Sequence, residues 1–152
     1  MSDIAFRRAA EADIAAIVAM LADDPLGAAR EDVSTPVPPA YLEAFRAIDA
    51  DPNQFLAVMT QDGRIVGTLQ LSFIPGLSRK GALRGQIEAV RVAGGRRGEG
   101  LGRRLFEWAI GECRARGCRT VQLTTDRSRA DAHRFYERLG FEASHLGYKL
   151  AL

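Results

Sequence analysis

Cysteine, histidine and long apolar runs are all scarce in this sequence of 152 residues. The two cysteines, Cys113 and Cys118, are too few for a disulfide framework, so we expect free thiols in a reducing, cytoplasmic setting. Neither they nor His133 and His145 show metal-ligand spacing, so no metal is expected. Charges interrupt every apolar stretch well short of the ~20 residues of a membrane span, and no export signal is recognisable at the start. These absences argue against a disulfide-rich secreted scaffold, a metal centre and a membrane protein.

The composition is typical of a globular protein, with 47% hydrophobic and 26% charged residues. A chain of this length can bury a core of ordinary size. No low-complexity tract or linker divides it. We therefore expect one domain over residues 1–152.

Positive charge is concentrated in the C-terminal half. Residues 1–76 carry 5 basic and 11 acidic side chains (net −6), whereas residues 77–152 carry 16 basic and 8 acidic side chains (net +8). Nearly all the basic residues are arginine, which suits phosphate binding, so the asymmetry predicts a polyanionic partner on this side. That partner is either nucleic acid or a phosphorylated small molecule. The overall charge of only +2 and the lack of a zinc-finger or helix-turn-helix pattern argue against nucleic acid.

Hydrophobic periodicity predicts the element order β-α-α-β-β-β-α-β-α-β(β), a mixed-sheet α/β fold. The expected strands lie at 4–8, 55–59, 64–73, 86–92 and 120–124, with one or two more over 141–152. The expected helices carry apolar stripes at 14–21, 41–48, 105–113 and 132–139. Asp23-Asp24-Pro25 is expected to end the first of them, and residues 25–39 are expected to form a loop. Asp62-Gly63 predicts a hairpin turn between two of the strands.

The sharpest local feature is the glycine- and arginine-rich turn 94–104, between a predicted strand and a predicted helix. The first N–H groups of a helix lack intrahelical partners and attract phosphate, and the glycines at 98, 100 and 102 let a ligand approach the backbone closely. A dinucleotide fingerprint would need glycine where Arg103 stands, and a Walker loop would need Lys-Ser/Thr in place of Leu101-Gly102. The alternative is a plain turn with solvated arginines.

Two segments resemble signatures of the GNAT superfamily of N-acetyltransferases. Arg97-Gly98-Glu99-Gly100-Leu101-Gly102 resembles the motif Gln/Arg-x-x-Gly-x-Gly/Ala, and residues 132–141 (AHRFYERLGF) are similar to the block Ala-x-x-Phe-Tyr-x-x-x-Gly-Phe. The resemblance implies a mixed, mostly antiparallel central sheet with helices on both faces. It also implies a V-shaped splay between two parallel strands, here 86–92 and 119–124, with acetyl-CoA as co-substrate lying in the splay.

The resemblance further implies a set of cofactor-binding residues. Strand residues 90–92 would bind the pantetheine arm through their backbone, and residues 97–102 with Arg103 would hold the pyrophosphate. A bulge near Val90 would direct an N–H at the thioester oxygen. Arg129, near a position where many relatives carry asparagine, is a further candidate contact. The full set is Val90, Arg91, Val92, Arg97, Gly98, Glu99, Gly100, Leu101, Gly102, Arg103 and Arg129.

Two side chains are candidates for proton transfer. An amine must lose a proton before it attacks, and Glu88, just before the splay, is the candidate base. Its alternative role is an exposed strand carboxylate paired with an arginine. Tyr136 is the candidate acid that protonates the departing thiolate, and its alternative role is a core aromatic beside Phe135. Sugar-phosphate acetyltransferases of the superfamily usually carry a second acid where this chain has Ala89, which argues against a sugar-phosphate substrate.

These features together predict acetyl transfer to a primary amine of a small molecule or peptide by direct attack. The alternative is a non-catalytic acyl-CoA-binding sensor or regulatory module, which needs the glycine turn but neither Glu88 nor Tyr136. The acceptor is expected opposite the cofactor, lined by the 25–39 loop, the first two helices and the C-terminal strands. We expect no nucleic-acid or membrane partner, and the resemblance leaves homodimer formation open.

Overall fold

The computed structural model describes residues 3–152 and divides them into two compact units. The first unit ends at Gln122 and contains the β-sheet, whereas the second, Leu123–Leu152, contains one helix and an irregular C-terminal segment. Within residues 3–152, no helix combines the length and apolar character that crossing a bilayer requires.

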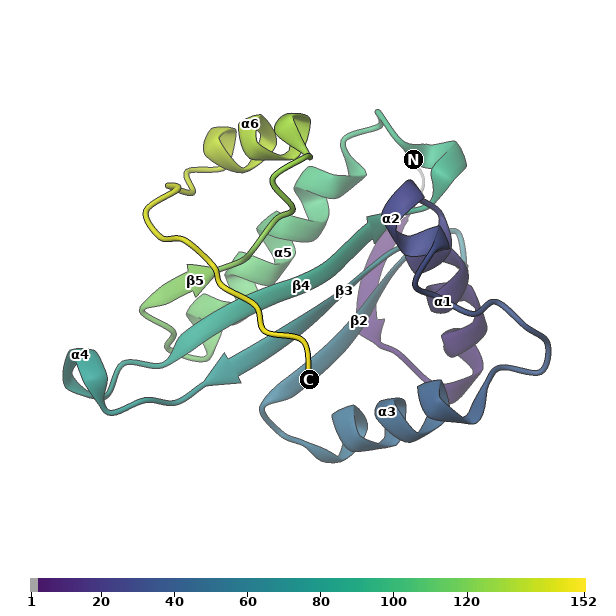
Figure 1. Cartoon of the computed structure of the whole chain (residues 1–152), viewed down its shortest axis with the longest axis horizontal. Helices are drawn as coiled ribbons and strands as arrows, with labels where there is room; N and C mark the ends of the chain where they lie inside the picture. The colour runs from purple at the N-terminus through teal and green to yellow at the C-terminus, as the bar shows by residue number, and fades with distance from the viewer. Residues whose placement is uncertain (1–2) are drawn as a thin grey trace. The chain divides into compact units, whose positions relative to one another are not determined.

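The first unit is built on a five-stranded sheet in the order β1-β2-β3-β4-β5 (Figure 1). Its strands are β1 (Ile4–Arg8), β2 (Gln54–Gln61), β3 (Arg64–Ile74), β4 (Arg84–Val92) and β5 (Thr120–Gln122). The first three pairings are antiparallel and only β4 and β5 run parallel, which confirms the predicted mixed, mostly antiparallel sheet. The β2–β3 hairpin turns at Asp62 and Gly63, whose φ angles of 50° and 78° suit a tight turn.

Helices pack on both faces of this sheet, as predicted. The helical elements are η1 (Glu11–Asp13), α1 (Ile14–Ala22), α2 (Pro25–Ala28), α3 (Pro39–Ala50), α4 (Ser78–Gly81), η2 (Gly94–Arg96), α5 (Leu101–Ala115) and α6 (Ala130–Arg138). Residues of α1 and α3 form an apolar cluster with Val58 of β2. The next residue, Met59, faces the opposite side, where α5 packs so closely that a Cβ on Gly67 would lie 2.8 Å from Leu105 Cδ1.

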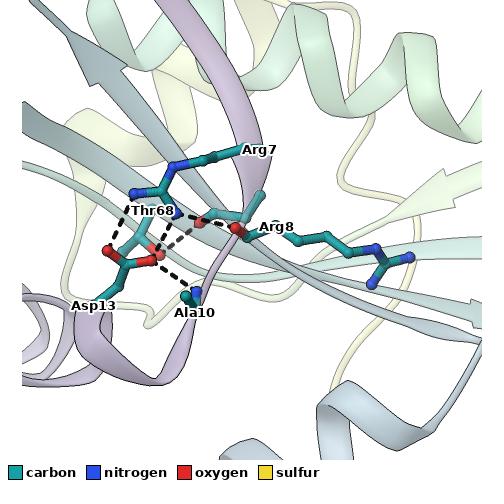
Figure 2. Close-up of polar contacts among 6 residues, drawn as sticks. Arg7, Arg8, Ala10, Asp13 and Thr68 are labelled. Atoms are coloured by element: carbon teal, nitrogen blue, oxygen red, sulfur yellow. Dashed lines mark hydrogen bonds and ion pairs between the residues drawn. The ribbon is translucent and has the colours of Figure 1, made fainter. Parts of the chain in front are cut away.

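One carboxylate fixes the junction between β1 and α1 (Figure 2). Asp13 accepts hydrogen bonds from both terminal nitrogens of Arg7, at 2.6 and 3.1 Å, and from the backbone N–H of Ala10 at 2.7 Å. The hydrogen bond from Arg7 lowers the pKa of the Asp13 carboxyl below its usual value. The largely buried Asp13 therefore stays ionised and holds α1 against the sheet.

The prediction of a loop over residues 25–39 was wrong at its start, because residues 25–28 form α2. Asp24 caps this short helix by accepting the N–H of Gly27 at 2.5 Å, and Pro25 occupies its first position. Aspartate followed by proline was interpreted as the end of α1. The same pair is also a helix-start signal, since proline lacks the N–H that a first turn leaves unpaired.

The predicted strands at the end of the chain were also wrong. Residues 141–152 belong to no sheet of the described chain, and β5 ends at Gln122 instead of reaching Thr124. Apolar side chains do alternate along this segment, at Leu146, Tyr148 and Leu150. All three are strongly exposed, so no other part of the described chain covers them. An alternating pattern gives the period of a strand but does not provide the neighbour whose backbone must pair with it.

Candidate active site

The pairing between the parallel strands β4 and β5 ends partway along β4. Their register pairs Arg84 with Thr120, Gly85 with Val121 and Gln86 with Gln122, whereas β4 continues to Val92. Within residues 3–122, the β5 ladder therefore leaves the backbone of residues 87–92 without a strand partner on this edge. On the opposite edge, β4 stays paired with β3 as far as Val92. The splay that the resemblance implied is thus present, with residues 90–92 along its open side.

A bulge interrupts β4 at the mouth of this splay. Glu88 lies opposite Gln70 and Arg91 lies opposite Thr68, so Ala89 and Val90 share one position on β3. Ala89 adopts a φ of 53°, which is uncommon for a residue with a side chain. The bulge near Val90 was predicted, and it turns the local backbone out of the regular ladder.

The glycine turn leads from β4 into α5. Gly98 and Gly100 have φ angles of 84° and 77°, in the left-handed region that glycine adopts without strain. Gly100 is the N-cap of α5, and no side chain accepts a hydrogen bond from the first N–H groups of that helix. The space around both glycines is open, with no other atom within 4 Å of an added Cβ. These helix amides are thus available to an anion, and the helix dipole favours one.

The arginines of this turn are paired with acidic side chains. Arg96 binds Glu99 at 2.7 Å, and this hydrogen bond lowers the pKa of the Glu99 carboxyl. Arg97 Nη2 donates to the backbone oxygen of Asp23 at 2.9 Å, and Arg103 binds Glu107 at 2.8 Å along α5. All of these contacts are at the surface. An incoming polyanion would have to compete with these carboxylates for the arginines.

The Arg91 side chain is paired with an acidic residue of the α1–α2 junction. Its Nε lies 3.2 Å from Asp24 Oδ2 in a largely buried ion pair, and its Nη1 donates to the carbonyl of Val90 at 2.9 Å. The guanidinium of Arg91 therefore joins β4 to the α1–α2 junction. The resemblance placed Arg91 in the cofactor set through its backbone, and its side chain has a structural partner in Asp24.

Glu88 is exposed and lies on β4 directly before the bulge. Its carboxylate accepts a hydrogen bond from the side-chain amide of Gln86, two residues earlier on the same strand. The predicted alternative, pairing with an arginine, is not the contact found. Glu88 has an amide donor that orients one carboxylate oxygen, while the side chain stays accessible.

Tyr136 and Arg129 belong to the second unit. Tyr136 is half-buried on α6, with its ring edge-on to Phe135 at 5.7 Å and to Phe141 at 6.2 Å between centroids. Arg129 is the N-cap of α6, and its backbone N–H donates to Asp126 at 3.1 Å. The structure thus groups Glu88, residues 90–92 and residues 97–103 in the first unit, and the other two candidates in the second.

Sequence reasoning missed three residues of this region. Asp23 and Asp24 were interpreted only as a helix stop, yet they bind Arg97 and Arg91. Gln86 was placed on its strand without a role, yet it holds Glu88. An acidic pair in the negative half of a chain with an arginine-rich other half was the available signal for the first two. No local signal existed for Gln86, because neutral glutamine is common on strands.

Two hollows border α1 near the predicted acceptor loop. One, of about 430 Å³, lies between the end of α1, Val33 and the Ala93–Gly94 segment. The other, of about 210 Å³, lies between α1 and loop residues 32–38. The first opens beside Asp23, next to the start of the glycine turn. Part of the 25–39 loop therefore lines both hollows.

Comparison with known proteins identifies the family. Residues 17–141 match the model of the Acetyltransferase (GNAT) family. The aminoalkylphosphonate N-acetyltransferase of Salmonella typhimurium strain LT2 is 34% identical over 113 residues, which are 74% of this chain and 73% of that enzyme. The glucosamine 6-phosphate N-acetyltransferase of Trypanosoma brucei brucei is 38% identical over 90 residues, 59% of each chain.

A solved structure is similar over nearly the whole chain. The crystal structure of a transcriptional regulator from Bacillus halodurans C-125 is 46% identical, with 99% of this chain and 100% of that one covered and a TM-score of 0.95. The family match spans β4, the glycine turn and the 132–141 block, the same features that the residues and the sheet geometry single out. The chain therefore belongs to the GNAT acetyltransferase family and is an N-acetyltransferase.

Proposed function

We propose that residues 1–152 act as a single domain that transfers the acetyl group of acetyl-CoA to a primary amine of a small molecule or peptide. The observation that carries this proposal is the continuity between two features of the first unit. The open edge of β4 runs directly into the uncapped start of α5. One ligand with amide groups at one end and a diphosphate at the other would form hydrogen bonds with both the strand edge and the first N–H groups of the helix. The two free thiols suit a reducing, cytoplasmic setting.

In this proposal the backbone does most of the cofactor binding. Residues 90–92 pair with the pantetheine amides as they would with an added strand. The N–H groups of residues 97–102 bind the pyrophosphate, with Arg103 beside them. Arg129 supplies a further contact. Acetyl-CoA is thereby oriented with its thioester at the bulge.

The chemistry is a direct attack of the amine on the thioester carbonyl. Glu88 takes a proton from the substrate ammonium group, directly or through a water molecule, so that the nitrogen lone pair becomes free. The N–H at the Val90 bulge donates to the carbonyl oxygen as negative charge develops there. The C–S bond then breaks, and the Tyr136 hydroxyl gives its proton to the departing thiolate. The attacking nitrogen loses its second proton to solvent, from which Tyr136 is reprotonated, and Glu88 releases the proton that it took. The products are the acetylated amine and free CoA.

Gly100 provides the test of the cofactor site. Gly100→Asp puts a carboxylate where the proposal puts the diphosphate, whereas Gly100→Asn has nearly the same shape without the charge, and both residues tolerate a left-handed backbone. We expect the aspartate variant to weaken acetyl-CoA binding at least tenfold more than the asparagine variant in calorimetry, from charge repulsion. Equal affinities of the two folded variants would refute the proposed site.

Turnover is tested by acetyl-CoA-dependent thiol release across a library of amines. Tyr136→Phe should lower kcat by roughly tenfold or more, since general acid catalysis contributes ~10²–10⁴-fold, with little change in acetyl-CoA affinity. Glu88→Gln should lower kcat/KM for the amine in the same way. If Tyr136→Phe leaves kcat unchanged, Tyr136 is not the acid.

A regulatory role is the second candidate, because the structure that is 46% identical carries the name transcriptional regulator. Such a sensor would bind acyl-CoA through the same glycine turn without using Glu88 or Tyr136. Tight acetyl-CoA binding with no thiol release for any amine would favour it. Thiol release with one amine would favour the enzyme.

A further inference from the structure

One face of the sheet carries an uninterrupted line of polar side chains that crosses four strands. The register places Gln54 of β2 opposite Ser72 of β3, Ser72 opposite Gln86 of β4, and Gln86 opposite Gln122 of β5. Directly paired residues project from the same face of a sheet. Gln70 lies two residues from Ser72 and therefore shares this face. We call these five residues, Gln54, Gln70, Ser72, Gln86 and Gln122, the amide row.

Hydrogen bonds join the amide row into two groups, one across β2 and β3 and the other across β4 and β5. Gln54 Oε1 accepts from Gln70 Nε2 and from Ser72 Oγ, both at 2.9 Å. Gln122 Nε2 donates to Gln86 Oε1 at 2.8 Å. At the β5 side Arg84 Nη1 lies 3.5 Å from Gln122 Oε1, and on β4 Gln86 donates to Glu88. The row thus consists of two bonded groups on neighbouring strands, and Gln86 of the second group holds the proposed base.

The opposite face of the same strands is apolar. Leu71 is fully buried and Ile87 is 2% exposed, whereas the four glutamines of the row are all half-buried. A Cβ on Gly85 would lie 2.4 Å from Cys113 of α5, which shows that α5 packs tightly on that side. At this end of the strands the two faces thus have opposite chemistry. Farther along β2 the face that carries the row is apolar as well, because Val58 packs there with α1 and α3. The four amides of the row are half-buried, whereas Ser72 is buried.

The bonds within the row leave much of its hydrogen-bonding capacity unused. Each side-chain amide has two N–H donors and an oxygen with two lone pairs. Of the four amides, only Gln54 has both lone pairs used by the row. A partner with groups that both donate and accept would satisfy what remains, and hydroxyl groups do both.

Other classes of amine fit this surface less well. An alkyl or aryl amine would cover the amides without bonding them, which is unfavourable. A polyamine needs further carboxylates, but the row is neutral and ends at Arg84. A peptide pairs with a strand edge through its backbone more readily than with the side chains of a sheet face.

The dimensions suit one ring. Glu88 lies two residues beyond Gln86, which is roughly 7 Å along β4, and the strands are about 4.8 Å apart. A six-membered ring whose amine reaches Glu88 would place its hydroxyls over Gln70, Ser72 and Gln86. We propose that the amide row is the acceptor platform and that the acceptor is a polyhydroxylated primary amine, an amino sugar or an aminocyclitol. This inference rests on the proposed acetyltransferase function.

Three amines test the inference: glucosamine, 2-deoxystreptamine and cyclohexylamine, which has the ring without hydroxyls. We expect the full-length protein to show a kcat/KM at least tenfold higher for one of the hydroxylated amines than for cyclohexylamine, each expressed per concentration of unprotonated amine. Equal or better use of cyclohexylamine, or of the peptide Ala-Ala-Ala, would overturn the inference but not the proposed function. If no amine reacts and acetyl-CoA does not bind, both fail.

Variants then separate substrate binding from sheet stability. Gln70→Leu and Gln86→Leu keep the side-chain size but remove the hydrogen bonds. Each should lower kcat/KM for the preferred hydroxylated amine roughly five- to tenfold, the effect of one lost hydrogen bond. Gln70→Leu should not lower cyclohexylamine use, because it removes an amide that this amine would cover without bonding. The ratio of variant to wild type cancels the different basicity of the amines. Gln86→Leu should affect both amines, because it also releases Glu88.

The control is Thr60→Val, a matched loss of a polar atom near the other end of β2, far from the row. It should leave the ratio of hydroxylated amine to cyclohexylamine unchanged. Melting temperatures show whether each variant folds. If Gln70→Leu does not fold, Ser72→Ala replaces it as the test variant. An unchanged ratio in a folded Gln70→Leu or Ser72→Ala protein would mean that the row only holds the strands together.

Discussion

At the scale of single residues, a few carboxylates hold the surroundings of the site in place. Asp13 joins β1 to the start of α1, and Asp24 joins the end of α1 to Arg91 on β4. Asp23 reaches Arg97 in the glycine turn. Helix α1 is therefore tied to the sheet at both ends, and one of these ties leads directly to the proposed cofactor site.

Asp13→Asn should lower the free energy of unfolding at pH 7 by about 1 kcal/mol, since it weakens a backbone cap and a half-exposed ion pair. The pKa of Asp13 is lowered in the folded protein, chiefly by Arg7. Its contribution is thus complete above the unfolded value near ~3.9 and is lost as the pH falls through the lower folded value. Urea unfolding at several pH values measures the difference between variant and wild type, which should shrink below about pH 4.

A control for Asp13 is Glu11→Gln, which removes an exposed partner of Arg46. Exposed ion pairs contribute little, so this variant should stay within about 0.5 kcal/mol of wild type. If the two variants lowered the free energy of unfolding equally, the capping position of Asp13 would contribute nothing beyond its charge.

At the scale of elements, the sequence predicted what local periodicity determines. β1 was predicted with its observed bounds, and the apolar stripes of α1, α3, α5 and α6 all lie on helices. The hairpin at Asp62-Gly63 was found because its turn residues are adjacent in sequence. For the same reason the glycine turn could be found, because its glycines lie close together around the start of one helix.

The missed features depend on partners distant in sequence. Apolar residues alternate along part of residues 141–152 as they do in a strand. A strand also needs a neighbouring strand whose backbone pairs with it, and a local pattern does not provide that partner. The φ of Ala89 follows from the register between β3 and β4, and the amide row becomes visible only once four strands are aligned. For the proposed catalytic residues, the residue types and spacing could be read from the sequence, but not that Gln86 would hold Glu88.

The packing of α5 on β4 gives a test at this scale. Gly85→Ala would bring a Cβ to 2.4 Å from Cys113 Sγ, far inside normal contact, and Cys113 is fully buried. We expect the variant to lose about 1–3 kcal/mol of unfolding free energy, the usual effect of overpacking. Burial raises the pKa of Cys113 to about 12, so this thiol stays neutral in the comparison.

A double-mutant cycle identifies the cause. Cys113→Ala alone should be mildly destabilising, because it removes a buried atom. In the Cys113→Ala background Gly85→Ala should become nearly neutral, as measured by urea unfolding. A full loss in both backgrounds would show that strain in the β4 backbone, and not the contact with α5, is responsible.

At the scale of the whole molecule, the two halves of the chain carry opposite net charges. Residues from the two halves form an ion pair beside the proposed cofactor site. The first 76 residues carry a net charge of −6, from 5 basic and 11 acidic side chains. The rest carry +8, from 16 basic and 8 acidic side chains. Arg97 and Asp23 meet from the two halves, with a side-chain separation of 3.5 Å at the surface. In the absence of a ligand, the acidic half therefore partly neutralises the turn that the diphosphate of acetyl-CoA is proposed to occupy.

Asp23→Asn should therefore strengthen acetyl-CoA binding, by roughly two- to fivefold at low salt, because a surface ion pair is worth up to about 1 kcal/mol. The gain should shrink in 0.3 M KCl, where the screening length falls below about 8 Å. Calorimetric titration at both salt concentrations measures this effect. Asp49→Asn, on exposed α3, makes the same change in net charge away from the turn and should alter the affinity much less. If both variants gain equally, net charge governs binding; if Asp23→Asn binds more weakly, Asp23 supports the turn instead of competing with the ligand.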